Sequence, residues 1–509
     1  MLKICFYSST IITNQTGNVK LRFSLIFMVT VGGLMHITVN RNDSTTMTKQ
    51  IYNQLKEYIL DGTLKSEEKL PSTRKLSESL KISKNIIINV YEMLAAEGYI
   101  VTRPGSGVYV SRSVSLKRGP AGAPELSFRS EYSIYDGNGI NFRIGLPALD
   151  HFPRSKWLQC CREVLNEIPS KDLGYGSSNG YLPFRKTLAA YLRKERGIQC
   201  REDQIIVTSG SIQGLHLMLL YFSQTNAAIA IEDPTTSGLK DLLDTSKIDF
   251  IAVPVDQDGF SPSLLPENRD ISCIITTPSH QYPLGGSMPI QRRIDLIRYA
   301  RNHNCYIIED DYDSEIRYSN QPVESLYELD PARVIYMGSF SKILLPSLRL
   351  GYAVLPYALV EKIYRLKWSI DIHTPTLLQA TMNKFITHGY LYQHLSKTIK
   401  LYRKRRQALI DALKNNFGDS IKIYGKEAGI HLVVEFEHVV FSEDLLVKII
   451  NAGIYVMCVG IHSLTPDKHS NQLMLGYGNL TESQIEKAIS ILHDVIEHHI
   501  LSPLDKEQP

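Results

Sequence analysis

The hydrophobic and polar positions change period along the chain, and each change marks a predicted element. Near the beginning, apolar residues recur at helical spacing in three consecutive segments, which begin at Thr46, Ser72 and Ser83. The period then falls to two on either side of a glycine-containing turn at 104–107. Three helices followed by such a hairpin predict a winged helix-turn-helix domain over residues 35–111.

A different pattern fills the second part of the chain, where short apolar runs alternate with helical or loop segments. The runs lie at 205–207, 228–231, 250–253, 271–275, 305–309 and 334–337. This alternation predicts a largely parallel, doubly wound α/β sheet in a large domain at 140–380. A long helical connection, three further runs (430–436, 453–459 and 473–477) and a helix from Glu482 predict a smaller domain at 381–509.

Two stretches fall outside these domains. Residues 112–139 lack periodicity and are rich in glycine, proline and basic side chains, which predicts a linker. Residues 1–34 contain an apolar run at 23–34 that is long enough for the core of a signal peptide, but no clear cleavage site of small residues follows. We therefore interpret residues 1–34 as an over-extended translation start, with Met35 as the first residue of the native chain.

Composition narrows the class of protein only slightly. The 509 residues exceed one hydrophobic core, and 43% hydrophobic with 21% charged residues is typical of a globular protein. The formal net charge of +4 is too small to indicate nucleic-acid binding by itself. Seven cysteines without a CxxC pair fit a reducing cytoplasm, and they predict neither a disulfide framework nor a metal site.

The strongest chemical motif surrounds Lys342, which follows Ser339 and Ser341 just after the run at 334–337. A lysine amine in this position can form a Schiff base, while hydroxyls and free backbone amides hold a phosphate. Lys342 is therefore a candidate anchor for pyridoxal 5′-phosphate.

Residues upstream supply partners for such a cofactor. Asp310 ends the run at 305–309, so it is expected at the carboxyl edge of the sheet, where open α/β sheets bind ligands. A carboxylate there can keep a pyridinium nitrogen protonated, and Tyr312 can hydrogen-bond the phenolic oxygen of the ring.

Two loops are expected beside this site. The turn at 208–214 opens a helix, whose free amides near Ser211 suit a phosphate. The loop at 277–285 could lie beside the cofactor ring, and we include its Tyr282 among the candidate cofactor-binding residues. Its His280 is either a proton carrier or a loop hydrogen-bonding residue.

The winged helix carries candidate DNA-binding residues. Arg74, Lys84 and Asn85 lie at the starts of the second and third helices, where side chains reach phosphates and base edges. Gly105 and Gly107 allow the hairpin to approach the DNA backbone or minor groove. The alternative is a winged helix that contacts protein.

Charge in this segment is modest, since residues 35–112 contain 11 Lys and Arg against 8 Asp and Glu, a net charge of +3. We therefore expect a dimer that combines two half-sites on double-stranded DNA.

The segment resembles the GntR superfamily of regulators in three stretches: Lys69 to Arg74, Ser83 to Asn85, and Glu97 to Gly107. By this resemblance, Ser83 joins the DNA-binding residues. One departure is Glu68, where the family commonly has glycine.

The second part resembles fold-type I aminotransferases, in the motifs around Lys342 and Asp310 and in Arg349 after them. A winged helix joined to such a domain is similar to the MocR subfamily, as are the stretches 279–281 and 309–315. The resemblance implies that Lys342 forms the internal aldimine, while Asp310 and Tyr312 contact the ring. It further implies a phosphate held by Ser211, Ser339 and Arg349, and a head-to-tail homodimer.

The effector is the open question. No arginine follows Arg406, and the loop at 232–238 has threonines where the subfamily often has an aromatic residue. An arginine that could bind the carboxylate of an amino acid at two points is therefore missing from this part of the chain. This argues against a working transaminase and favours a PdxR-like sensor of pyridoxal phosphate, or of its aldimine with an amine, that controls vitamin B6 synthesis. The alternatives are a regulator that responds to an amino acid such as GABA, and an active aminotransferase with an accessory DNA-binding domain.

Overall fold

The computed structural model describes residues 8–13, 19–24, 26–31, 35–41, 43–112, 114, 139–318, 324–465 and 468–501, and only the backbone before Ile37. The chain forms two compact units, Met1–Arg129 and Ser130–Pro509, which we describe separately. The predicted linker at 112–139 lies almost wholly outside the described residues.

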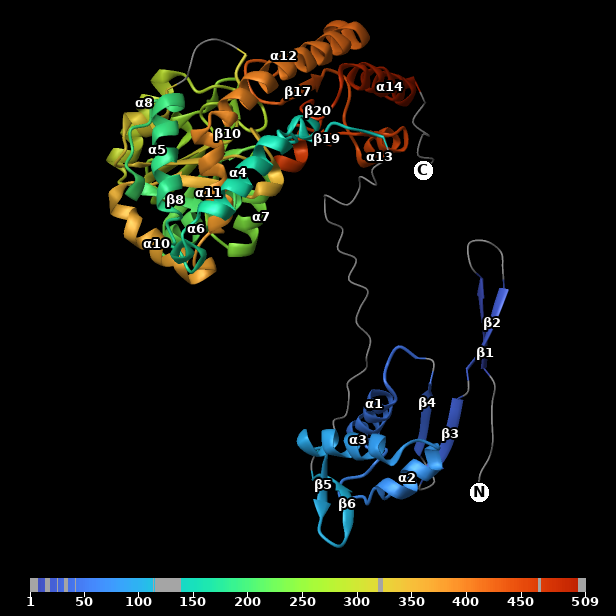
Figure 1. Ribbon diagram of the computed structural model, residues 1–509. Helices are drawn as coiled ribbons and strands as arrows, with labels where there is room; N and C mark the ends of the chain where they lie inside the picture. The colour runs from blue at the N-terminus through green and yellow to red at the C-terminus, as the bar shows by residue number, and fades with distance from the viewer. Residues whose placement is uncertain are drawn as a thin grey trace. The chain divides into compact units, whose positions relative to one another are not determined.

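The N-terminal unit contains the three expected helices and the hairpin (Figure 1). They are α1 (Met47–Leu60), α2 (Thr73–Leu80), α3 (Lys84–Ala96), β5 (Ile100–Arg103) and β6 (Gly107–Val110). The side chains of Thr46 and Ser72 cap α1 and α2 by accepting backbone hydrogen bonds, and the sequence predicts the cap at Ser72. The sequence also predicts a cap at Ser83 before α3, but its hydroxyl makes no capping hydrogen bond, so that prediction is wrong.

A strand that the sequence analysis did not predict completes this unit. Strand β4 (Met35–Asn40) pairs antiparallel with β3 (Ile26–Val31), and Ile37 and Val39 are buried in the same core as the helices. Two further strands, β1 (Ser8–Thr13) and β2 (Val19–Ser24), form a separate hairpin. That the native chain begins at Met35 stays a prediction.

The turn before the wing differs from the expectation for Glu68. The residue with left-handed backbone is Glu67, with φ of 63°, so the position that favours glycine is one residue earlier. The Glu67 carboxylate lies 3.0 Å from both Arg103 and Arg112, which links this turn to the wing.

The C-terminal unit is built on an eight-stranded sheet of order β11-β10-β9-β12-β13-β14-β15-β8. The central strands β9 (Ala228–Asp233), β10 (Phe250–Asp256), β12 (Ile271–Thr276), β13 (Tyr306–Asp311) and β14 (Val334–Ser339) run parallel, as predicted. Strand β15 (Gly351–Val354), which the sequence analysis missed, lies antiparallel between β14 and β8 (Ile205–Thr208). The short β11 (Gly259–Phe260) pairs antiparallel with β10.

Helices cover both faces of this sheet (Figure 1). One buried cluster joins alternate strand residues to α5 (Leu182–Arg196), α8 (Ile290–Asn302) and α11 (Thr376–Thr387). The intervening strand residues pack in a second cluster against α6 (Ser211–Phe222), α7 (Ser237–Ser246) and α10 (Tyr357–Asp371). The sheet is therefore doubly wound, which confirms the predicted fold class.

The remaining elements form a smaller layer. Helix α4 (Arg154–Glu167) packs near α11, while the long α12 (Tyr390–Phe417) leads to a four-stranded sheet. That sheet contains β16 (Ile421–Tyr424), β17 (His431–Phe436), β20 (Gln472–Gly476) and β19 (Met457–Cys458), while β18 (Ile454–Tyr455) pairs with β7 (Ile140–Asn141). Helices α13 (Glu443–Asn451) and α14 (Glu482–Leu501) complete it. None of the described helices is long and apolar enough to cross a membrane.

Candidate functional site

The predicted site residues of the C-terminal unit gather at the carboxyl edge of the large sheet. Asp310 lies near the end of β13 and Ser339 is the last residue of β14. In the register of the neighbouring strands, Ser339 pairs with Gly351 and Gly351 pairs with Thr208, just before α6 begins at Ser211. The sheet therefore brings together three chain segments that are far apart in sequence.

Lys342 lies three residues beyond β14 and is half-buried. Burial lowers the pKa of its amine, and the nearby Arg143 lowers the pKa further. Gly145 has a φ of 75°, and a Cβ there would overlap Nζ of Lys342. Glycine at position 145 therefore leaves room for the amine of Lys342.

Asp310 is buried, with 8% of its surface exposed, and its Oδ1 has no hydrogen-bond partner among the described residues. Burial, then the neighbouring Asp311 and Glu232, raise its pKa to about 7. A buried acceptor without a partner costs free energy, so this oxygen is suited to accept a hydrogen bond from a ligand.

Tyr312 belongs to a buried chain of polar groups. Its hydroxyl lies 3.1 Å from Nδ1 of His280, and the same nitrogen lies 2.9 Å from Oδ2 of Asp313. The ring of Tyr282 packs edge-on against Tyr312, with 5.7 Å between centroids. His280 is thus bound within the site loop, which agrees with the hydrogen-bonding alternative for this residue.

The candidate anion site lies where β8 turns into α6. The first amides of a helix lack partners within the helix, and these begin at Ser211. The Arg349 guanidinium lies beside this turn: Nη2 donates to the backbone oxygen of Ser209 at 3.1 Å, and a Cβ at Gly210 would lie 2.7 Å from the same nitrogen. The Ser339 hydroxyl, at the end of β14 and separated from β8 by β15, accepts a hydrogen bond from the backbone amide of Ser341 at 3.1 Å.

Sequence reasoning missed several residues that shape the site. Glu232 accepts hydrogen bonds from Thr276, Thr277 and the side chain of Gln281, and so fixes the loop that carries His280. Arg143 and Gly145 were missed because they lie about two hundred residues before Lys342. Their approach follows from the pairing of β7 with β18, which no local pattern reveals.

The DNA-binding candidates lie in the N-terminal unit, on its surface. Arg74, Ser83, Lys84 and Asn85 are exposed at the starts of α2 and α3. Arg74 donates to Glu78 at 2.9 Å, one turn along the same helix. Gly105 and Gly107 flank the wing turn with φ of 73° and 121°, and a Cβ at Gly107 would lie 2.9 Å from the Lys69 side chain. Here glycine serves the turn itself.

Comparison with known families agrees with this division. Residues 47–110 match the family of bacterial regulatory proteins called gntR, and residues 138–492 match the aminotransferase class I and II family. Among curated proteins, the chain is 33% identical over 425 residues to a probable rhizopine catabolism regulatory protein, MocR, of Rhizobium meliloti, covering 80% of this chain and 85% of that one.

The pyridoxine biosynthesis regulator PdxR of Corynebacterium glutamicum is 28% identical and is covered over 98% of its length, with 90% of this chain. Among solved structures, an α-aminoadipate aminotransferase of Thermus thermophilus, complexed with N-(5′-phosphopyridoxyl)-L-leucine, superimposes with a TM-score of 0.65 at 25% identity. The match covers 71% of this chain and 93% of that chain.

The raised pKa of Asp310 predicts that the free energy of unfolding of the cofactor-free protein depends on pH. Asp310 has a folded pKa of about 7, against about 3.9 when unfolded. Between these values the folded state binds more protons, so its stability falls as pH rises. We expect the unfolding free energy of the wild type, relative to Asp310→Asn, to fall by a few kcal/mol between pH 5 and pH 8.

Urea unfolding of both cofactor-free proteins at several pH values measures this difference. Glu309, whose pKa is also raised by burial, is common to both proteins and cancels. A difference between the two proteins that does not change with pH would show that Asp310 is already ionised at pH 5.

Proposed function

This chain belongs to the MocR subfamily of GntR-type regulators, and from that premise we propose that it is a transcriptional regulator that binds pyridoxal 5′-phosphate at Lys342. The observation that carries the proposal is the juxtaposition of Lys342 with Asp310 at the carboxyl edge of the sheet, in a chain that also has a winged helix. The winged helix supplies DNA binding, and the aminotransferase-like unit supplies the sensor.

The residues of the site fit the cofactor. Oδ1 of Asp310, which lacks a partner within the described part of the chain, can accept a hydrogen bond from a pyridinium nitrogen, and the half-buried Tyr312 can bind the phenolic oxygen. The start of α6, with Arg349 beside it, suits a phosphate. When bound, the cofactor supplies an aldehyde that condenses with amines, and Lys342 supplies the amine that holds it.

A second copy of the chain is the partner that we propose for an exposed apolar surface of the C-terminal unit. Tyr175 is 88% exposed, and Leu173, Trp368, Ile370 and Ile372 are also exposed. Tyr175 packs edge-on against His373, which follows Ile372 directly, so two of these segments are neighbours. Exposed apolar side chains at this density favour burial in a homodimer, which would also provide two winged helices for repeated half-sites.

We further propose that the effector is the cofactor itself, which makes control of vitamin B6 synthesis the leading role. Beside the site, Val433, Val459 and Met474 form a buried apolar cluster with Ile144 and Leu284 packed on it. Ile144 directly precedes Gly145, which contacts Lys342. Apolar surroundings suit a ring better than a second carboxylate.

One observation favours the alternative of an amino-acid effector. Arg143 lies close enough to Lys342 to affect its pKa, so a guanidinium is present on this side of the site although none follows Arg406. An amino acid, including GABA, therefore stays in the test as an added amine.

The role of Lys342 is tested by DNA-binding titrations. For the wild type, we expect pyridoxal phosphate alone to change either the affinity or the footprint on DNA upstream of its own and neighbouring genes. Lys342→Ala should still bind this DNA but should lose the absorbance band of the bound cofactor and the response to it, because no amine remains to hold the aldehyde. A band that persists in Lys342→Ala and is reducible by borohydride would remove Lys342 from the mechanism.

Added amines separate the remaining hypotheses. If only cofactor plus one amine changes DNA binding, the effector is that amine, and the vitamin B6 assignment is wrong. Multiple-turnover transfer of an amino group to a keto acid would instead identify an active aminotransferase.

The DNA surface is tested by Lys84→Ala. If Lys84 contacts a phosphate, the dependence of log K on log salt should become shallower by about 0.9, and affinity should fall for all sequences alike. Lys362→Ala, in exposed α10, is the matched control and should leave the slope unchanged. An unchanged slope for Lys84→Ala would place the DNA elsewhere.

A further inference from the structure

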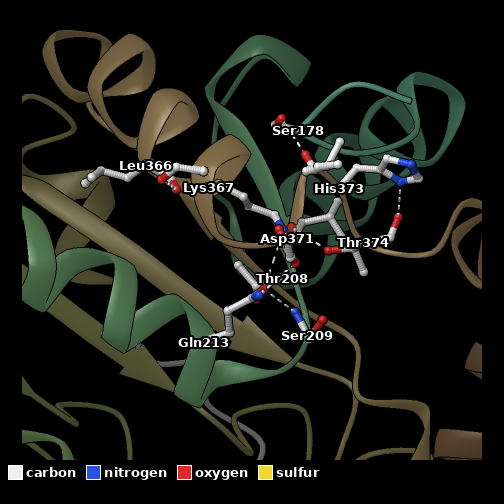
Figure 2. A network of polar contacts seen from close by, with 12 residues as sticks. Ser178, Thr208, Ser209, Gln213, Leu366, Lys367, Asp371, His373 and Thr374 are labelled. Atoms are coloured by element: carbon white, nitrogen blue, oxygen red, sulfur yellow. Dashed lines mark hydrogen bonds and ion pairs between the residues drawn. The ribbon is translucent and has the colours of Figure 1, made fainter. Parts of the chain in front are cut away.

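A buried lysine lies outside the site but next to it. Lys367, in α10, is 0% exposed, and its Nζ lies 2.8 Å from both carboxylate oxygens of Asp371, one turn later (Figure 2). Burial lowers the pKa of Lys367, while Asp371 opposes that shift. Removing an ammonium ion from water costs several kcal/mol, so burying the Lys367–Asp371 pair at the end of α10 carries a large desolvation cost.

The pair connects directly to the first turn of α6. The side-chain amide of Gln213, the third residue of α6, donates to Oδ2 of Asp371 at 2.8 Å. The Oδ2 atom of Asp371 thus accepts from both Lys367 and Gln213, and Nζ of Lys367 also lies 3.5 Å from Oε1 of Gln213. These three side chains form one network, which Figure 2 shows between α10 and α6.

Gln213 also links this network to the backbone that precedes α6. Its Oε1 accepts the backbone N–H of Ser209 at 2.8 Å. The backbone carbonyl of Ser209 accepts a hydrogen bond from Arg349 at 3.1 Å. Ser209 is therefore held at both its N–H and its C=O, immediately before the amides that begin α6.

The segment after Asp371 is held in an unusual conformation. Ile372 has φ of 60° and ψ of −64°, and the His373 amide bonds to the Asp371 carbonyl at 2.6 Å, which defines a tight γ-turn. Such a conformation is costly for a β-branched residue and persists where surrounding contacts fix it. The contacts here are Ser178 on the Ile372 carbonyl at 2.5 Å and Thr374 on the carbonyl of Val207, in β8, at 3.1 Å.

We propose that Lys367, Asp371 and Gln213 are positioning residues that hold the start of α6 in the geometry that binds the phosphate of the cofactor. They contact no part of the site that would receive the ring, so their effect is confined to the phosphate end. This inference rests on the proposed function, because it requires that the site binds a phosphorylated ligand.

The test compares two ligands that differ only in the phosphate. Dissociation constants for pyridoxal phosphate and for pyridoxal are measured by absorbance on the full-length protein freed of cofactor. Lys367→Met removes the charge at similar volume, and Gln213→Leu releases Ser209 while leaving the buried ion pair intact. The matched control is Lys362→Met, on the exposed side of the same helix, where Nζ lies 3.0 Å from the Tyr221 hydroxyl.

We expect both variants to weaken pyridoxal phosphate about tenfold or more, the effect of losing one hydrogen bond to a charged group. The dissociation constant of pyridoxal should change by less than about twofold, because pyridoxal has no phosphate to contact the start of α6. Inorganic phosphate should compete with the cofactor in the wild type and in Lys362→Met, and less well in Gln213→Leu.

Two outcomes would overturn the inference alone. If the variants weaken both ligands equally, the network is merely structural, and if they change neither dissociation constant, it does not position the phosphate site. If the wild type itself binds neither ligand, the proposed function is wrong. Gln213→Leu keeps the test valid should Lys367→Met fail to fold, because Gln213 is only half-buried.

Discussion

The C-terminal unit depends on the burial of three consecutive carboxyl groups at the end of β13, Glu309, Asp310 and Asp311. Removing carboxylates from water is costly unless each finds a partner, and the strand sends alternate side chains to opposite faces. Asp311 is paired with Arg196 at 2.7 Å and also accepts from Tyr336 at 2.7 Å. Glu309, on the same face, accepts the Tyr327 amide at 3.1 Å. Asp310 faces the other way, toward Lys342, and its Oδ1 lacks a partner within the described residues. Asp311 is thus paired, Glu309 is paired at one carboxylate oxygen and fully buried, and Asp310, with 8% of its surface exposed, is the group that is left for a ligand.

Partners for these groups come from distant parts of the chain, and their contacts hold the loops of the candidate site. Arg196 ends α5 and, besides pairing with Asp311, donates to Ser279 at 3.1 Å. Ser279 precedes His280, whose ring is fixed by Asp313, two residues beyond Asp311. Glu232, at the end of β9, binds the other side of the same loop. The acidic stretch at 309–315 therefore holds the loop at 277–285, as well as contributing Asp310 and Tyr312 to the candidate site.

The sequence was sufficient to predict the parts whose pattern is local. Apolar runs that end in functional residues marked β13 and β14, so Asp310 and Lys342 could be placed at one sheet edge before the structure was known. The helices of the winged domain were equally visible, because their periods and caps lie within a few residues.

Arg143, Gln213 and Lys367 could not be found in this way. Gln213 meets Asp371 across 158 positions, and a glutamine or a lysine on a helix is far more often solvent-exposed. Strand β15 was missed since four residues after Arg349 are too short a run to separate from a loop.

Exclusion of water shifts the pKa values of Asp310 and Lys342 in opposite directions. Burial raises the pKa of Asp310 and lowers that of Lys342, so in each group it shifts the equilibrium toward the uncharged form. In the complex that we propose, a cationic ring nitrogen would return the charge to Asp310, because an opposite charge stabilises the carboxylate. Loading the site therefore relieves a cost that folding imposes on Asp310. A sensor requires such a difference, because a ligand shifts an equilibrium only by its unequal free energy in two states.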